Sequence, residues 1–269
     1  MTILGNSRHA RRKPEANQMN ENRTLRWAGL CGAAVLPPTI VILALNDFPY
    51  PDDTLPGQAY WDYMMPHYTA EVGGIIWIYT VASALLFTLL LARAYHLRAG
   101  HTTATGIAMS GCMIAFVSNT FMNCTAYMVP TMMARGLPSF GTEADLQLFT
   151  YSWNFTQLGN AVSTSLLAIV WGAIFIANRS HPILPRWLGH WGAGLAVVVN
   201  VISPVFVLLP TGPWSPSSLF HFLMQGGPTW GWITAAGIYL LLRKAPTAHA
   251  ESNPTDHTQP HRIEKGSNG

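Results

Sequence analysis

The chain has 269 residues, of which 49% are hydrophobic and only 10% are charged, whereas about 25% of an average soluble domain is charged. This composition is typical of an integral membrane protein and excludes an ordinary soluble domain. The net charge of +3 is a signal of membrane topology, since no helix or ribbon of clustered basic and aromatic residues predicts a nucleic-acid partner.

Six uncharged segments are each long enough to cross a hydrocarbon core of about 30 Å, at about 1.5 Å per residue. The expected spans are residues 27–45, 72–92, 104–134, 146–178, 187–209 and 217–242. The sequence therefore predicts an all-α integral membrane protein, a bundle of six transmembrane helices within residues 27–244. A basic N-terminal arm, residues 1–26, precedes this domain, and the polar tail, residues 245–269, is expected to be disordered.

Nearly all basic residues fall on one side of such a bundle. The N-terminal arm, the second and fourth connections and the residues after the last span hold all of the 15 Lys and Arg residues except Arg135. Because cytoplasmic segments carry the excess of Lys and Arg, both termini are expected in the cytoplasm. We accordingly expect a multi-pass protein of the cell membrane, inner or plasma, with membrane lipid as a partner.

Proline and aromatic residues mark the first span and the loop after it. Pro37 and Pro38 should kink the first helix or end it early, because proline lacks a backbone donor and clashes with the preceding turn. The loop at residues 46–66 combines prolines with Tyr and Trp residues, so it is expected to be ordered. It is either a lid over the bundle or an interfacial aromatic belt.

His67 and Glu71 stand four residues apart at the start of the second span, and so on one face of a helix. Such a pair can act as acid and base or supply two metal ligands; the alternative is a polar pair that caps the span beside water. The His-x-x-x-Glu element resembles one in membrane sterol isomerases of the emopamil-binding type, over these two residues alone. The other acidic residues of such a site are missing from the spans, so no membership of that family is inferred, and no metal or cofactor is predicted.

Amide side chains form stripes on the third and fourth expected spans. The third span carries Asn119, Asn123 and Tyr127, and the fourth carries Asn154, Gln157 and Asn160. The two spans run in opposite directions and a short loop joins them. The stripes are therefore expected at the same depth on neighbouring antiparallel helices.

The fifth and sixth segments add polar groups at this depth. Asn200 falls in the outer half of the fifth span, and His221 and Gln225 fall in the outer half of the sixth. The Gly-Gly-Pro run at residues 226–228 interrupts the last segment. This predicts a last helix that is kinked or broken near Gly226–Pro228.

The predicted bundle is apolar in its cytoplasmic half and polar in its outer half. The leading hypothesis is a membrane protein whose uncharged outer cavity binds or passes a small neutral or amphipathic, lipid-like molecule. The residues expected to line this cavity are Asn119, Asn123, Tyr127, Asn154, Gln157, Asn160, Asn200 and Gln225. The simpler alternative is that these amides pair with one another between helices.

Two other functions stay open. An isomerase, hydratase or cyclase acting on a lipid or terpenoid would use His67, Glu71 and His221 as catalytic residues. An accessory subunit of a larger membrane complex, or a homo-oligomer, would dock through small-residue helix faces. A pump or a retinal protein is not expected, because the spans carry no Lys and no mid-membrane carboxylate.

Overall fold

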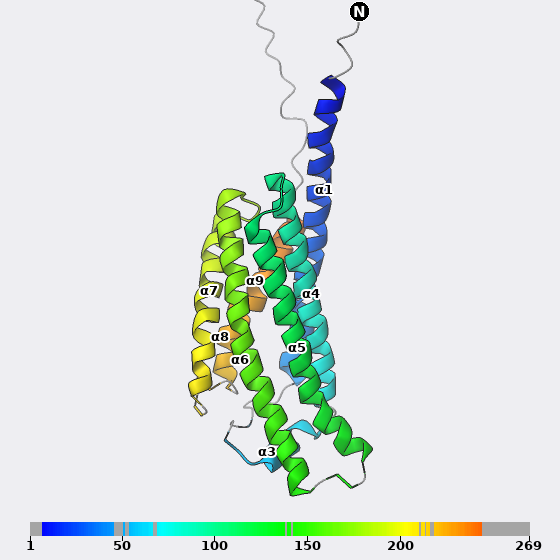
Figure 1. Cartoon of the computed structure of the whole chain (residues 1–269), viewed down its shortest axis with the longest axis vertical. Coiled ribbons are helices and arrows are strands. Elements are labelled where there is room, and N and C mark those ends of the chain that lie inside the picture. Colours follow the sequence, from blue (N-terminus) through cyan, green and yellow to red (C-terminus); the bar gives the residue numbers. More distant parts are fainter. Residues whose placement is uncertain are drawn as a thin grey trace, which may run out of the picture.

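The computed structural model describes residues 7–45, 51, 54–66, 69–137, 139–140, 142–209, 211–212, 214–215 and 218–243. These residues form a helical bundle, and none of them lies in a β-strand (Figure 1). The predicted all-α class is confirmed for this part of the chain.

Five helical stretches of the described chain are long and apolar enough to cross a membrane. They are Asn17–Leu45, Glu71–Ala99, Ala104–Gly136, Asp145–Ser180 and Trp187–Val205. These stretches overlap the first five expected spans in order along the chain. The helices and the composition together indicate a membrane-embedded protein.

The first of these stretches is divided by prolines. Helix α1 (Ser7–Ala33) begins well before the expected span start at residue 27, so most of the basic arm is helical. It ends at a turn, and α2 (Leu36–Leu45) follows with Pro37 and Pro38 in its first turn. Proline is tolerated there because the first N–H groups of a helix have no partner within the helix. The expected early end of the first helix is therefore observed.

Three long helices pack in a row: α4 (Thr69–Ala99), α5 (Ala104–Gly136) and α6 (Glu143–Ser180). Helix α5 packs against both of the others (Figure 1). Helix α6 starts at a capping box, in which Thr142 and Asp145 each accept a hydrogen bond from the other's backbone N–H. With 38 residues, α6 is about 57 Å long and exceeds what one crossing needs.

The last two expected spans are built from shorter pieces. The fifth consists of η2 (Trp187–Gly192), α7 (Ala193–Ile202) and η3 (Ser203–Leu208), where η2 is π-helical and η3 is 3₁₀. The sixth consists of α8 (Leu219–Gly226), the π-helical turn η4 (Gly227–Gly231) and α9 (Trp232–Leu242). This sixth stretch is not among the five that qualify as candidate spans.

The break expected near residue 228 is a widened helical turn. Gly226 keeps helical backbone angles, φ −72° and ψ −41°, and Pro228 lies inside the π-turn that follows. A wider turn moves the carbonyl of the preceding turn away from the proline ring, which relieves the clash that proline causes in a regular helix. The backbone therefore changes from the α-helical to the π-helical hydrogen-bond pattern there and stays helical.

Two packed cores hold the bundle together. The larger includes an aromatic contact between Trp171 of α6 and Trp232 of α9, with ring centroids 4.9 Å apart. The smaller forms where α3 (Gly57–Met64) packs on α6, with Tyr60 stacked on Trp153 at 5.4 Å. A Cβ on Gly57 would lie 2.1 Å from the Leu146 carbonyl oxygen, so this close approach requires glycine. The loop expected to be ordered thus contains a helix packed on α6.

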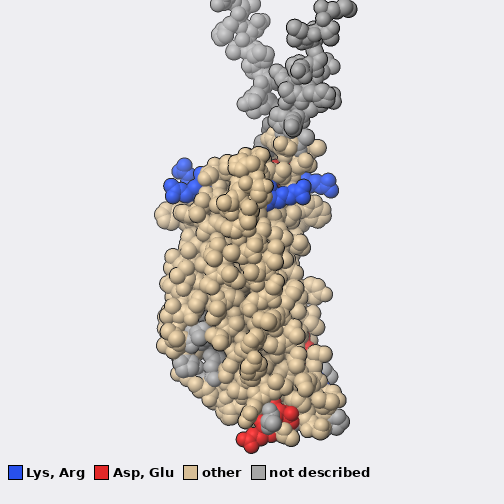
Figure 2. All heavy atoms as spheres, viewed as in Figure 1, with Lys and Arg blue, Asp and Glu red and all other residues tan. Residues whose placement is uncertain are grey.

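Charge distinguishes the two ends of the bundle. Figure 2 shows Lys and Arg gathered near one end of the molecule and Asp and Glu near the other. We call the end where α4 and α6 finish, with Arg98 and Arg179, the basic end. The opposite end, where α6 begins with Glu143 and Asp145 and where α3 packs, is the α3 end.

Candidate functional site

Amide and hydroxyl groups join α5 to α6 near the middle of both helices. Asn119 donates through Nδ2 to the Gly159 carbonyl at 3.2 Å, and Asn123 donates through Nδ2 to Asn160 Oδ1 at 3.1 Å. Thr156 donates through Oγ1 to the Asn123 carbonyl at 3.3 Å. We call these five residues the amide seam. They confirm that α5 and α6 are antiparallel neighbours with polar stripes at one depth.

Asn123 is the most buried amide of the seam, at 1% exposure. It lies against Gly159, where an added Cβ would come within 2.5 Å of its Oδ1. Glycine at this position lets the two helices approach closely enough for the amides to meet. Asn123 Oδ1 is buried and has no hydrogen-bond partner in the described structure, so the seam contains one acceptor that its neighbours do not use.

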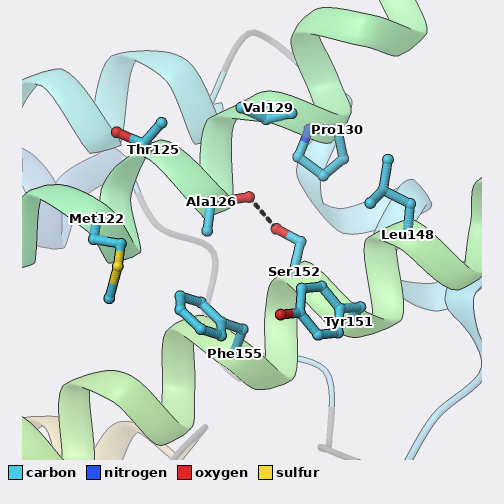
Figure 3. Close-up of a pocket in the computed structure, with 9 residues that line it drawn as sticks. All are labelled: Met122, Thr125, Ala126, Val129, Pro130, Leu148, Tyr151, Ser152 and Phe155. Carbon is cyan, nitrogen blue, oxygen red and sulfur yellow. Dashed lines mark hydrogen bonds between the residues drawn. The ribbon is translucent and has the colours of Figure 1, made fainter. Parts of the chain in front are cut away.

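An open groove of about 530 Å³ runs along the α5–α6 contact beside the seam. Its walls come from both helices, and most of the exposed wall is apolar (Figure 3). The lining residues are Met122, Thr125, Ala126, Val129, Pro130, Leu148, Tyr151, Ser152 and Phe155. We call it the α5–α6 groove.

Pro130 explains the polar contact in this groove. Proline has no backbone N–H, so the carbonyl four residues earlier, that of Ala126, loses its usual partner within α5. Ser152 of α6 donates its hydroxyl to this carbonyl (Figure 3). A proline is tolerated inside α5 because a hydroxyl from the neighbouring helix satisfies the freed backbone group.

Asn154 and Gln157 lie on another face of α6. At about 100° per residue, each is turned about 100° or more around the helix from Thr156, which faces α5. Both side chains are half-buried, and Asn154 Oδ1 is buried without a hydrogen-bond partner in the described structure. The predicted single stripe of α6 therefore divides between the amide seam and a second face of the helix.

Two further expected residues lie apart from the seam. Tyr127 packs its ring 6.1 Å from that of Trp153, in the aromatic core under α3. Asn200 is fully buried and donates through Nδ2 to the Ala196 carbonyl at 2.7 Å and to Thr229 Oγ1 at 3.1 Å. It thereby ties α7 to the π-turn η4.

The structure thus brings together Asn119, Asn123 and Asn160 and places Asn154, Gln157, Tyr127 and Asn200 at other contacts. The side chains of His221 and Gln225, and the whole of His67, lie outside the described residues. Much of the expected enzyme site is therefore not described.

Glu71, the remaining candidate catalytic residue, forms an ion pair. Arg135 of α5 donates through Nε to Glu71 Oε1 at 3.1 Å and through Nη2 to the Met65 carbonyl at 2.6 Å. One guanidinium therefore joins the start of α4, the end of α5 and the segment after α3. Among the described residues, no group of three or more His, Cys, Asp and Glu side chains could hold a metal ion.

Two features of the site were not predicted from the sequence. Pro130, inside the third expected span and near its end, was a signal that a carbonyl one turn earlier needs an outside donor, but the sequence does not say which hydroxyl reaches it. Arg135, the one basic residue expected on the outer side, was a signal that Glu71 has a partner there.

Comparisons with protein-family models, with curated proteins and with solved structures found no significant match.

Proposed function

We propose that the chain is a six-span membrane protein with both termini in the cytoplasm, which binds a small neutral or amphipathic, lipid-like molecule at the α5–α6 groove. The observation that carries the proposal is the open, mainly apolar groove between α5 and α6, placed at the level where the hydrocarbon core would end. Three arguments support it: charge distribution, depth and the chemistry of the walls.

Charge distribution supports the orientation. Lys and Arg gather at the basic end and Asp and Glu at the α3 end (Figure 2). Since basic residues flank spans on the cytoplasmic side, the basic end faces the cytoplasm in this proposal. The stretch α8–η4–α9, residues 219–242, completes the sixth crossing and returns the chain to that side.

Helix length supports the depth of the site. A hydrocarbon core of about 30 Å takes about 20 residues of helix. Counted from Thr103 and Arg179 at the basic ends of α5 and α6, that distance ends near Asn123 and Gly159. The amide seam then lies at the outer boundary of the hydrocarbon core, and the groove lies at and just beyond it.

The groove chemistry suits a molecule with both apolar and polar parts. Its walls offer Met122, Val129 and Phe155 to an apolar moiety, and Thr125 and Tyr151 carry hydroxyls at the same level. Ligand sites of this kind combine apolar walls with a few polar groups that orient the ligand. The site carries no net charge, which favours a neutral or zwitterionic ligand.

Filling the groove tests the proposal. Ala126→Phe projects a ring into the groove, whereas Ala115→Phe places the same ring on an exposed position of α5 away from it. We expect the wild-type protein to retain a lipid-like molecule in native mass spectrometry and to gain thermal stability from it. Ala126→Phe should lose both, and Ala115→Phe should keep both.

A second filling variant, Leu148→Trp, acts from the α6 wall and guards against damage to the Ala126–Ser152 contact. Equal retention by wild type, Ala126→Phe and Leu148→Trp would contradict a ligand in the groove. The isomerase, hydratase or cyclase alternative has no support from the contacts of the described residues. Of its three candidate catalytic side chains only that of Glu71 is described, and it is ion-paired with Arg135.

A further inference from the structure

Two arginines at the basic end meet on one short loop. Arg98, in the last turn of α4, donates through Nη1 to the Pro182 carbonyl and through Nη2 to Glu21 of α1. Arg243, directly after α9, donates through Nη1 to the Ile183 carbonyl at 3.2 Å. The loop between α6 and η2 therefore accepts hydrogen bonds from two guanidinium groups at the carbonyls of adjacent residues.

The loop is itself fixed by Asn178 at the end of α6. Asn178 Oδ1 accepts from the backbone N–H groups of Ile183 and Leu184 at 3.0 and 2.9 Å, and Nδ2 donates to the Leu184 carbonyl at 3.1 Å. Tyr95 donates its hydroxyl to the same Oδ1 at 3.1 Å. The carbonyls that orient the two arginines are thus pre-positioned, which reduces the entropy lost when a ligand binds.

Among the described residues, only one of these two arginines has a carboxylate partner. Glu21 pairs with Arg98, whereas Arg243 has no carboxylate partner in the described part of the chain. A half-buried cation without a counter-ion is unfavourable. A guanidinium group carries five N–H donors. The described contacts use two of them on Arg98 and one on Arg243, so both groups keep donors for an anion.

We propose that Arg98 and Arg243 form a binding site for a phosphate group. Planar guanidinium forks match phosphate oxygens in pairs, and such charge-assisted hydrogen bonds are about twice as strong as neutral ones. The phosphate comes either from the headgroup of an anionic phospholipid, which basic clusters between spans attract, or from a soluble phosphate-bearing molecule. This site lies at the opposite end of the bundle from the α5–α6 groove and does not depend on it.

The experiment uses the full chain in nanodiscs of phosphatidylcholine, with and without phosphatidylglycerol. Lipid retention is measured by native mass spectrometry, and thermal stability is measured with added inorganic phosphate or pyrophosphate. Arg243→Gln removes one guanidinium group. We expect the apparent affinity for phosphatidylglycerol, or for phosphate or pyrophosphate, to fall by about tenfold. Arg243→Lys keeps the charge without the planar fork and should lie between wild type and Arg243→Gln.

Arg93→Gln is the matched control. Arg93 is an exposed arginine of α4 near the same end, turned about 140° around the helix from Arg98, so its loss removes the same charge and should change affinity by less than about twofold. Retention of phosphatidylglycerol alone identifies a lipid headgroup, and stabilisation by phosphate or pyrophosphate in phosphatidylcholine discs identifies a soluble ligand. No preference for either probe in the wild type, or equal losses in Arg243→Gln and Arg93→Gln, overturns the site.

Discussion

Asn178 at the basic end and Asn123 in the amide seam occupy similar surroundings, yet they are used differently. Each is 1% exposed, and each lies against a glycine of a neighbouring helix or turn, Gly189 and Gly159 respectively. Asn178 takes part in four hydrogen bonds through its side chain. The Asn123 side chain donates one, and its Oδ1 has no partner in the described structure.

The difference shows how one residue type serves two purposes in a membrane bundle. At the basic end the amide replaces backbone partners that a turning chain would otherwise lack, because the N–H groups of Ile183 and Leu184 have left the helical pattern. In the seam the helices on both sides keep their own backbone bonds, so the amide adds a contact between them and keeps an acceptor. The polar groups of the basic end therefore satisfy one another, whereas the seam leaves one buried acceptor unused in the described structure.

The largest effect expected from this comparison is that of Asn178→Ala. The substitution leaves two buried N–H groups without acceptors, and each such group costs about 1 to 3 kcal/mol. We expect a loss of about 3 kcal/mol in the free energy of unfolding, measured by reversible denaturation in detergent. A loss no larger than that of Asn123→Ala would show that the basic end is not held by this amide.

The two glycines give a prediction of intermediate size. An added Cβ at Gly189 would lie 2.0 Å from Asn178 Nδ2, and the four hydrogen bonds of Asn178 prevent it from moving away. Gly189→Ala should therefore cost about 2 kcal/mol. Gly159→Ala should cost about 1 kcal/mol, because Asn123 is held by one side-chain bond and can rotate.

Gly194→Ala controls for helix propensity, since no atom lies within 4 Å of a Cβ added there. It should be neutral or slightly stabilising. Thermal unfolding of the three variants in one detergent measures the order. A Gly159→Ala variant less stable than Gly189→Ala would reverse the comparison between the two ends.

The smallest effect expected is that of Asn123→Ala. It removes one interhelical hydrogen bond, and such bonds contribute about 0.6 kcal/mol on average in a membrane protein. The same change also removes the unpartnered Oδ1, which offsets part of the loss. A destabilisation near 3 kcal/mol in the same denaturation assay would show that the seam is as tightly held as the basic end.

The helical class and most of the spans follow from composition and hydropathy, because a bilayer admits only a helix or a closed barrel and rewards long uncharged segments. Five such segments recur as helices of sufficient length, and the prolines at 37 and 38 divide the first of them as expected. The depth shared by Asn119, Asn123 and Asn160 also follows from the sequence, since antiparallel neighbours joined by a short loop place equal counts of residues at equal levels.

The partner of each polar group was decided by tertiary structure. Rotation of α6 about its own axis directs Asn160 toward α5 and Asn154 away from it, and helical periodicity alone does not identify which face meets which neighbour. In the same way, Pro130 in the sequence means that the Ala126 carbonyl needs a hydrogen-bond donor from outside its own helix. Only the packing of α6 on α5 shows that Ser152 is this donor. The sequence by itself determined which polar groups need a hydrogen-bond partner and their approximate depth in the bundle. Only the close approach of particular helices determined which residue is that partner. The physical reason is that a hydrogen bond depends on distances of a few ångströms, which no spacing along the chain specifies.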